Sequence, residues 1–371
     1  MSDTAPEPRV DGEAIVYRLF DVGYAIALDR AFDRLASSGP ERRRPTRGEA
    51  QTIRIPNPPV TVSLGRETVT IGGRETEAEL SARLFDFGVI SMRAKVRTAD
   101  GLDWESFAHW GGELGRFAWT ELLAGARDAL LARLGDAVEQ PRLFPGTEDY
   151  TVFRVNRLLD ATGEPLAPAA LSTDRIARLL IGERRALTAE AKAELLSPRL
   201  GYYADDLVVL TWGNALVVEP EPDDTDVQYV LEFANAQLLE LRWYDAVLEA
   251  EVPTIQLRFL QARQGFRFIG RRYNRLLERL QRMVADSVEL MERLENSLRV
   301  TDDVYLARVY SAALEEFRER SWRNGIERKV AIVREAYDML NAESLARRSE
   351  TLEIAIVLLI MFEIALTLLR H

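Results

Sequence analysis

The chain of 371 residues contains no cysteine and only two histidines, His109 and His371. Without cysteine it can form neither a disulfide nor a thiolate zinc site, and two isolated histidines nearly exclude a histidine-based metal centre or proton relay. His109 lies beside a run of aromatic residues with no second histidine or cysteine nearby, so we interpret it as a bystander. The sequence therefore predicts no metal and no cofactor.

Catalytic signatures are missing as well. The chain has no Gly-x-x-x-x-Gly-Lys phosphate loop, no Gly-x-Gly-x-x-Gly fingerprint, no Gly-x-Ser-x-Gly nucleophile elbow and no His-Glu-x-x-His zinc motif. Carboxylates abound in any acidic protein, so no pair of them stands out as general acid and base. We therefore predict that the protein is not an enzyme and name no catalytic residue. An enzyme whose site has no local motif stays open as an alternative.

Lysine is scarce, since Lys95, Lys192 and Lys329 are the only three among 48 basic residues. This arginine bias, with abundant alanine, indicates a GC-rich bacterial genome. The 59 acidic residues give a formal net charge of −11, which argues against general nucleic-acid binding but allows a local basic patch. The N-terminal twenty residues lack a basic segment followed by an apolar one, so we expect no secretion signal.

A long apolar run stands near the end of the chain, at residues 352–369 (LEIAIVLLIMFEIALTLL). All but three of its 18 residues are apolar, the exceptions being Glu353, Glu363 and Thr367. At ~1.5 Å per residue it reaches about 27 Å, close to the thickness of the bilayer's hydrocarbon core. Because Arg347 and Arg348 precede the run, we expect a C-terminal tail anchor in the inner (cytoplasmic) membrane, with the body facing the cytoplasm.

Two other interpretations of this run stay open: a helix buried in an oligomer, and a helix lying on a membrane surface. In each case the protein meets its surroundings through the apolar run, and the expected partners are a lipid bilayer, further copies of the chain, or an unknown protein. The candidate contact residues are Leu352, Ile356, Leu359, Ile360, Glu363 and Leu366.

The first 220 residues predict an α+β domain with a mixed or antiparallel sheet. Residues 60–64, 68–71 and 84–96 have strand patterns, the last with Gly88 at a bulge, and residues 103–134 are helical. The clearest hairpin is at residues 205–218 (DDLVVLTWGNALVV), where two β-branched runs flank a Gly-Asn turn. Strands interleaved with helices are typical of the α+β class.

The remainder of the chain is predicted to be helical. Residues 227–250 run without proline, a heptad pattern covers residues 273–298, and a new helix begins at Val304 after the N-cap residues Asp302 and Asp303. We expect a long helical hairpin whose second arm continues into the apolar run. The predicted division is residues 1–50 (N-terminal strands and a basic loop), 51–222 (α+β domain), 226–346 (helical hairpin or coiled coil) and 349–371 (apolar helix).

One basic patch stands out from the acidic background. Eight arginines lie between Arg258 and Arg282 with aromatic residues between them, a pattern that can contact RNA, anionic lipid or acidic protein surfaces. We interpret the patch first as a structural or solvated face, and keep RNA or ribosome contact as an alternative function. The candidate residues for an anionic partner are Arg263, Arg267, Arg271, Arg272 and Arg275.

Three stretches carry a family resemblance: DDLVVLTWG at 205–213, VTDDVYLARVY at 300–310, and LEIAIVLLIMFEIAL at 352–366. With these, roughly residues 200–371 resemble the "required for meiotic nuclear division" or Sad-interacting-factor-like family, a domain of unknown function. The hairpin strands here are aliphatic where other members are richer in phenylalanine. The resemblance implies a membrane-anchored, oligomeric, non-catalytic protein whose mitochondrial relatives support translation in the organelle.

From these observations we expect a membrane-anchored, non-catalytic, oligomeric scaffold or assembly factor. The alternatives are a soluble homo-oligomer with a buried C-terminal helix, and an RNA- or ribosome-contacting protein that uses the arginine patch.

Overall fold

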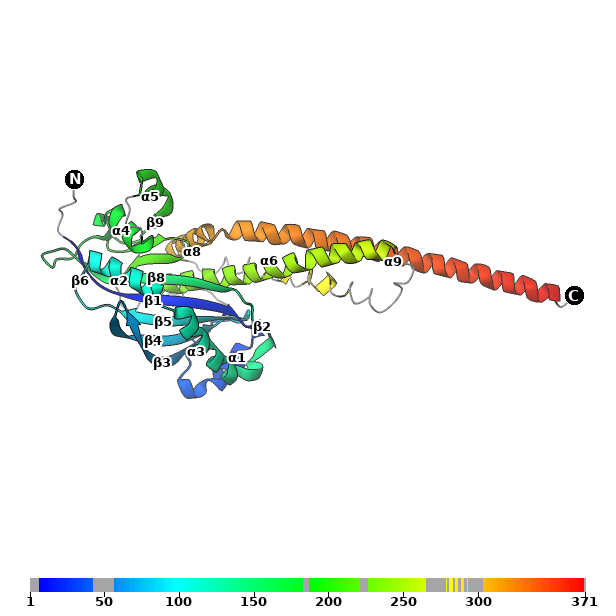
Figure 1. Ribbon diagram of the computed structural model, residues 1–371, viewed down its shortest axis with the longest axis horizontal. Coiled ribbons are helices and arrows are strands. Elements are labelled where there is room, and N and C mark those ends of the chain that lie inside the picture. Colours follow the sequence, from blue (N-terminus) through cyan, green and yellow to red (C-terminus); the bar gives the residue numbers. More distant parts are fainter. Residues whose placement is uncertain are drawn as a thin grey trace. The chain divides into compact units, whose positions relative to one another are not determined.

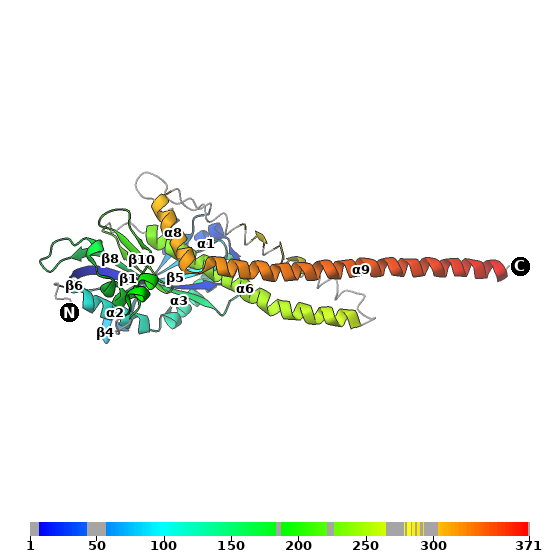
Figure 2. The same ribbon diagram turned by 90° about the horizontal axis from the view of Figure 1, so that it is seen from above.

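The computed structural model describes residues 7–42, 57–182, 187–220, 226–264 and 303–369, with a few residues between 278 and 292. The chain forms two compact units, one of residues 1–243 and 296–320, the other of residues 244–295 and 321–371. All strands of the described residues belong to the first unit. Figures 1 and 2 show the elements of both units.

The described strands of the first unit form a nine-stranded mixed sheet with the order β3-β4-β5-β1-β8-β11-β10-β9, and with β6 paired to β1. Its pairs are antiparallel except β11 with β8, which is parallel. β2 and β7 form a separate antiparallel pair. The strands are β1 (Arg9–Asp21), β2 (Gly23–Ile26), β3 (Val60–Ile71), β4 (Arg74–Leu84), β5 (Val89–Arg97), β6 (Leu102–Asp103), β7 (Val138–Pro141), β8 (Thr147–Leu159), β9 (Arg199–Leu200), β10 (Leu207–Leu210) and β11 (Asn214–Val218).

Several helices begin at residues whose side chains cap the first turn. Asp103 accepts a hydrogen bond from the Ser106 amide at 2.8 Å, and Asp303 accepts from the amides of Tyr305 and Leu306. The helices are α1 (Leu28–Arg34), α2 (Trp104–Arg116), α3 (Trp119–Leu134), α4 (Thr173–Leu180), α5 (Ala189–Leu195), α6 (Asp226–Gln264), α8 (Val304–Glu316) and α9 (Glu319–Leu369), with short 3-10 turns at Ala36–Ser38, Gly135–Ala137 and Pro168–Ala170.

The two faces of the sheet are covered by different helices. Alternate residues of β1, among them Val16 and Phe20, belong to one hydrophobic core together with α2, α3 and α4. The opposite face packs against the first part of α6 and against α8. There Phe85 lies 5.9 Å from Phe233, and Tyr150 lies 5.5 Å from Phe317, between ring centroids. The sheet is therefore the middle of three layers.

Two local predictions have different outcomes. The hairpin at 205–218 is confirmed, because β10 and β11 pair antiparallel. Its turn lies one residue before the predicted Gly213-Asn214: the Thr211 amide donates to the Asn214 carbonyl, and Asn214 is already in β11. The single strand predicted at 84–96 is wrong, because the chain reverses between β4 and β5. Gly88 lies in that turn with φ +90°, and a Cβ there would come 1.9 Å from the Gly23 carbonyl oxygen.

The second unit contains the later part of α6 and most of α9. Lys329 of α9 donates hydrogen bonds to Asp245 at 2.8 Å and to Glu249 at 3.2 Å, and Ile326 and Val333 are buried. The two helices therefore contact each other side to side in this unit. Nearly all of the predicted heptad at 273–298 lies outside the described residues.

The predicted transmembrane helix is wrong for the part of the chain that the structure describes, where no helix is at once long enough and apolar enough to cross a membrane. Glu353 and Glu363 interrupt the run and leave residues 354–362 as its longest stretch of consecutive apolar residues. The structure is α+β with a large mixed sheet. The membrane assignment and the tail-anchored inner-membrane location depended on this helix, so these two predictions are corrected as well.

Candidate functional site

The most exposed apolar surface of the described residues is the distal part of α9, residues 352–364, which we call the apolar end. Ten large apolar side chains there are each between 48% and 66% exposed. They are Leu352, Ile354, Ile356, Val357, Leu358, Leu359, Ile360, Met361, Phe362 and Ile364. Monomeric proteins rarely leave so large an apolar surface uncovered, so the apolar end is a candidate interface.

These side chains point in every direction around the helix. At 100° per residue, the largest angular gap between neighbouring members is about 60°, between Phe362 and Leu359. A helix that is apolar all round is normally buried on all sides, whereas a helix at the surface of a domain buries one stripe. One straight neighbour would therefore leave much of the apolar end uncovered.

The sequence-predicted contact residues on α9 are brought together by the helix. Leu352, Ile356, Leu359 and Ile360 are exposed on one side, near Glu363. Leu366 is in α9, but its side chain lies outside the described part of the chain.

The structure describes little of the arginine patch. Arg263 lies in α6, near its end, while Arg267, Arg271, Arg272 and Arg275 lie outside the described residues. RNA or ribosome contact through this patch stays a prediction.

A second candidate site, which the sequence did not reveal, is a buried polar cluster between the sheet and α6. Register places Tyr17 of β1 opposite Arg93 of β5, and Ser91 of β5 opposite Arg83 of β4. Glu232 of α6, only 1% exposed, forms an ion pair with Arg83. Tyr17 Oη, Ser91 Oγ, Arg93 Nε and Glu232 Oε1 are buried and have no hydrogen-bond partner among the described residues.

Burial controls the titration of this cluster. Desolvation raises the pKa of the Tyr17 hydroxyl far above its ordinary value of 10.0, although Arg93 opposes the shift. The pKa of Tyr229, against whose ring Arg83 lies at 4.6 Å, is raised for the same reason. Both hydroxyls therefore stay protonated at neutral pH. The geometry shows that polar contacts of Arg83 hold α6 against the sheet.

Beside it, one carboxylate gathers three cations. Glu13 of β1 lies 3.0 Å from Lys95, 3.4 Å from Arg154 and 3.7 Å from Arg97. Register explains the contact, because Glu13 is the cross-strand partner of both Arg97 and Arg154. This arrangement neutralises part of the positive charge on that face of the sheet.

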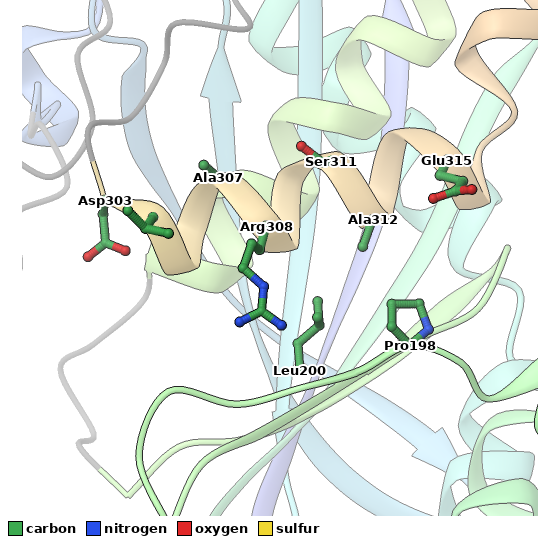
Figure 3. A pocket seen from close by; sticks show the side chains of 9 residues that line it. Pro198, Leu200, Asp303, Ala307, Arg308, Ser311, Ala312 and Glu315 are labelled. Atoms are coloured by element: carbon green, nitrogen blue, oxygen red, sulfur yellow. The ribbon is translucent and has the colours of Figure 1, made fainter.

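A third candidate site is a groove between β9 and α8, with a volume of about 510 Å³. Figure 3 shows Pro198 and Leu200 on one side and α8 on the other, with Arg308 reaching toward Leu200. The helix contributes small side chains to the lining, Ala307, Ser311 and Ala312. The groove exists because these residues leave space that larger ones would fill.

Within the described ranges, no three histidine, aspartate or glutamate side chains are placed to hold an ion. The residues of the polar cluster and of the groove come from distant parts of the chain. Only the alternation of polar and apolar residues in β4 and β5 hinted that one face of the sheet carries charge.

Comparison with known proteins places the chain in a family. Residues 11–225 match the family described as "Uncharacterized protein MJ0711, N-terminal domain". The chain is also 26% identical, over 195 residues, to the uncharacterized protein MJ0711 of Methanocaldococcus jannaschii. That alignment covers 53% of this chain and 59% of the relative, so the match extends over little more than half the length of each.

No solved structure matches the chain. The resemblance to the "required for meiotic nuclear division" family is not addressed by these matches and stays a prediction. The matched segment begins in β1 and ends just before α6, so it contains all the described strands of the sheet and leaves out the long helices. The chain belongs to the family of the MJ0711 N-terminal domain.

Proposed function

We propose that the protein is a non-catalytic assembly factor whose copies join through the apolar end of α9. The single observation that carries this proposal is the all-round exposure of ten large apolar side chains at residues 352–364. A second copy supplies the complementary surface, because the same apolar end can cover itself in a bundle. The family domain is then the part that the assembly displays in several copies.

The energetics favour more than two copies. Each of the ten side chains is about half exposed, so covering it contributes about 1 kcal/mol, or roughly 10 kcal/mol for each chain. A single partner covers about half of this surface, which gives roughly 10 kcal/mol for a dimer. Association itself costs about 4–15 kcal/mol, so a dimer gains little. A bundle of three or more helices covers the whole surface and is clearly favoured.

Two matched sets of substitutions test the proposal. Leu352→Gln, Ile356→Gln and Leu359→Gln change one side of the apolar end, and Ile354→Gln, Leu358→Gln and Met361→Gln change the opposite side. Glutamine keeps helix propensity close to that of leucine, so α9 itself should persist. In a bundle of three or more copies, both triple variants should lose self-association, whereas a dimer would be sensitive to one of them.

Sedimentation velocity of the full chain distinguishes these outcomes. The control carries Ile332→Gln and Met339→Gln, two exposed apolar residues nearer the start of α9, and should sediment like the unchanged protein. If neither triple variant sediments differently from the unchanged chain, the apolar end does not hold the copies together and the proposal fails.

A further inference from the structure

The outer edge of β3 carries backbone groups that the sheet does not use. β3 is the first strand in the order of the sheet, and it pairs with β4 on its inner side (Figure 1). Glu41 pairs with the outer side of Thr61, near the start of the strand. From Arg66 to Thr70 no backbone partner lies on the outer side among the described residues, and all of these residues except Val69 are exposed. Such an edge is a template for an added strand.

The turn between β3 and β4 shows which backbone groups face outward. Ile71 and Arg74 flank a two-residue turn, so they form the hydrogen-bonded pair that closes the hairpin. Because bonded residues alternate along an antiparallel strand, the N–H and C=O groups of Val69 and Glu67 also face β4. The residues between them direct these groups outward, and they are Arg66, Thr68 and Thr70.

We propose that this edge of β3 pairs with the same edge of a second copy of the chain, so that two sheets join into one. Strand addition at a sheet edge is a recurring mode of recognition. Two copies of one edge that continue a sheet are related by a two-fold axis perpendicular to the sheet, and this symmetry makes the two strands antiparallel. The register that uses every outward group places Thr68 opposite itself and Arg66 opposite Thr70. The inference goes beyond the proposed function, because β3 and the apolar end belong to different units.

The charges beside the edge fit this register. Arg66 lies 3.3 Å from Glu79 and 3.5 Å from Glu77 of its own hairpin. Glu75, the cross-strand neighbour of Thr70, is exposed and has no ion-pair partner among the residues that the structure describes. In the proposed pair, Arg66 of one copy faces Thr70 of the other, with Glu75 one strand further, or about 10 Å away between Cα atoms. The arginine can reach over the short threonine, so the unpaired acid of each copy gains a cation.

The opposite face of the strand carries one charge that acts against the pairing. Glu67 is exposed, and in this register it lies opposite Val69 and diagonal to Glu67 of the second copy. Like charges at this spacing weaken a strand pair. Only three residues of each copy direct backbone groups across the contact, so it is a small one. A method that traps a short-lived pair is therefore the suitable test.

The absence of cysteine allows this test by disulfide capture, since each single-cysteine variant carries one thiol. Thr68→Cys places two thiols opposite each other, at a Cα separation of about 5.5 Å that a disulfide accepts. In Thr70→Cys or Arg66→Cys, the two thiols are offset by about 13 Å along the strands. Under mild oxidation, Thr68→Cys should form a covalent dimer at least tenfold faster than either. A mixture of Thr70→Cys and Arg66→Cys should form the mixed dimer at least tenfold faster than each variant alone.

The full-length variants also carry the Leu352→Gln, Ile356→Gln and Leu359→Gln changes, so that capture does not depend on the apolar end. Failure of capture then concerns β3 alone, and failure of the proposed function leaves capture unchanged. Within Thr68→Cys, Thr70→Pro removes one outward N–H, at an edge position where proline is tolerated, and should slow capture at least tenfold. Thr70→Ala keeps the N–H and is the matched control.

Substitutions of the charges test the register further. Within Thr68→Cys, Glu75→Gln should slow capture about threefold, because Arg66 of the second copy loses its added partner. Glu67→Gln should accelerate capture about twofold, because it removes the repulsion on the other face. Glu121→Gln, at an exposed position of α3, is the control and should have no effect.

Two results would overturn the proposal. One is capture of Thr68→Cys at the same rate as Thr70→Cys and Arg66→Cys alone, because the edges would then meet only by random collision. The other is equal capture in the presence of Thr70→Pro and of Thr70→Ala, because backbone pairing would then have no part in the contact.

Discussion

Arg242 of α6 donates a hydrogen bond to the carboxylate of Glu148 in β8, across 94 residues of sequence. Glu148 is almost completely buried. Burial raises its pKa from 4.5 to about 7, more than the nearby Arg242 lowers it. The pair joins the sheet to α6, and its charge state changes within the physiological pH range.

A pH dependence of stability follows from this pair. Because the pKa is raised on folding, the contribution of Glu148 to stability is fully present below about pH 4.5 and is lost as the pH rises through about 7. The difference corresponds to about 3 kcal/mol, so Glu148→Gln should be more stable than the unchanged protein by about that amount at pH 8, with little difference at pH 5. Urea unfolding at the two pH values, followed by tryptophan fluorescence, measures it.

The control for this experiment is Glu139→Gln, at an exposed position paired with Arg30. It should leave the pH dependence unchanged. Burial also raises the pKa of Asp21. The stability of the Glu148→Gln variant should therefore still fall with rising pH, but less steeply than that of the unchanged protein. Parallel stability curves for Glu148→Gln and the unchanged protein would show that Glu148 does not titrate as described.

The buried pair of Arg83 and Glu232 should be strongly coupled. Arg83→Met leaves the Glu232 carboxylate buried without its partner and should cost about 3–5 kcal/mol of unfolding free energy. Adding Glu232→Met should recover part of this loss, because no charge is then left in the core. A double-mutant cycle by urea unfolding measures the coupling. Arg66→Met, at an exposed pair with Glu79, is the control and should cost under about 1 kcal/mol. Additive effects at Arg83 and Glu232 would contradict the described contact.

The turn between β4 and β5 should require glycine at position 88. Gly88→Ala would bring a Cβ to 1.9 Å from the Gly23 carbonyl oxygen at φ +90°, so the turn or the neighbouring strand must move. We expect a loss of more than 3 kcal/mol, beyond the cost of about 1–3 kcal/mol for the backbone conformation alone. Gly101→Ala, at φ +68° with no atom within 4 Å, isolates that backbone cost. Thermal unfolding that is equally affected by the two variants would contradict the close approach.

In the second unit, Lys329 should hold α6 against α9. Lys329→Met removes its hydrogen bonds to Asp245 and Glu249 and should lower local stability by about 1 kcal/mol. Hydrogen exchange of the α6 amides from Tyr244 onward measures this as faster exchange. Arg334→Met, an exposed cation on the same helix, is the matched control and should exchange like the unchanged protein. Unaltered exchange in Lys329→Met would show that the pair does not stabilise the helices.

Local sequence signals predicted local structure well. The two β-branched runs predicted the β10–β11 hairpin, although its turn lies one residue before the predicted Gly213-Asn214. Asp303 predicted the start of α8, because a cap depends on a few adjacent residues. The same local reading failed at Gly88. A glycine in a run of strand-forming residues fits a bulge or a turn, and the approach of Gly23, far away in sequence, makes it a turn.

The polar cluster and the groove could not be predicted from the sequence for a related reason. Tyr17 and Glu232 are 215 residues apart in the chain, and they approach each other because of strand register and the position of α6. The groove depends on small residues of α8 facing an edge strand, and nothing in sequence shows which strand lies at the edge. The apolar end was visible as a composition, but composition alone could not distinguish a membrane span from an exposed helix end between two glutamates.

The most direct test of the account is the molar mass of the full-length chain, measured by light scattering during size-exclusion chromatography over a range of concentrations. Self-association through the apolar end of α9 predicts a particle of at least three times the mass of one chain, which persists on dilution to micromolar concentration. A particle with the mass of one chain at every concentration would contradict it.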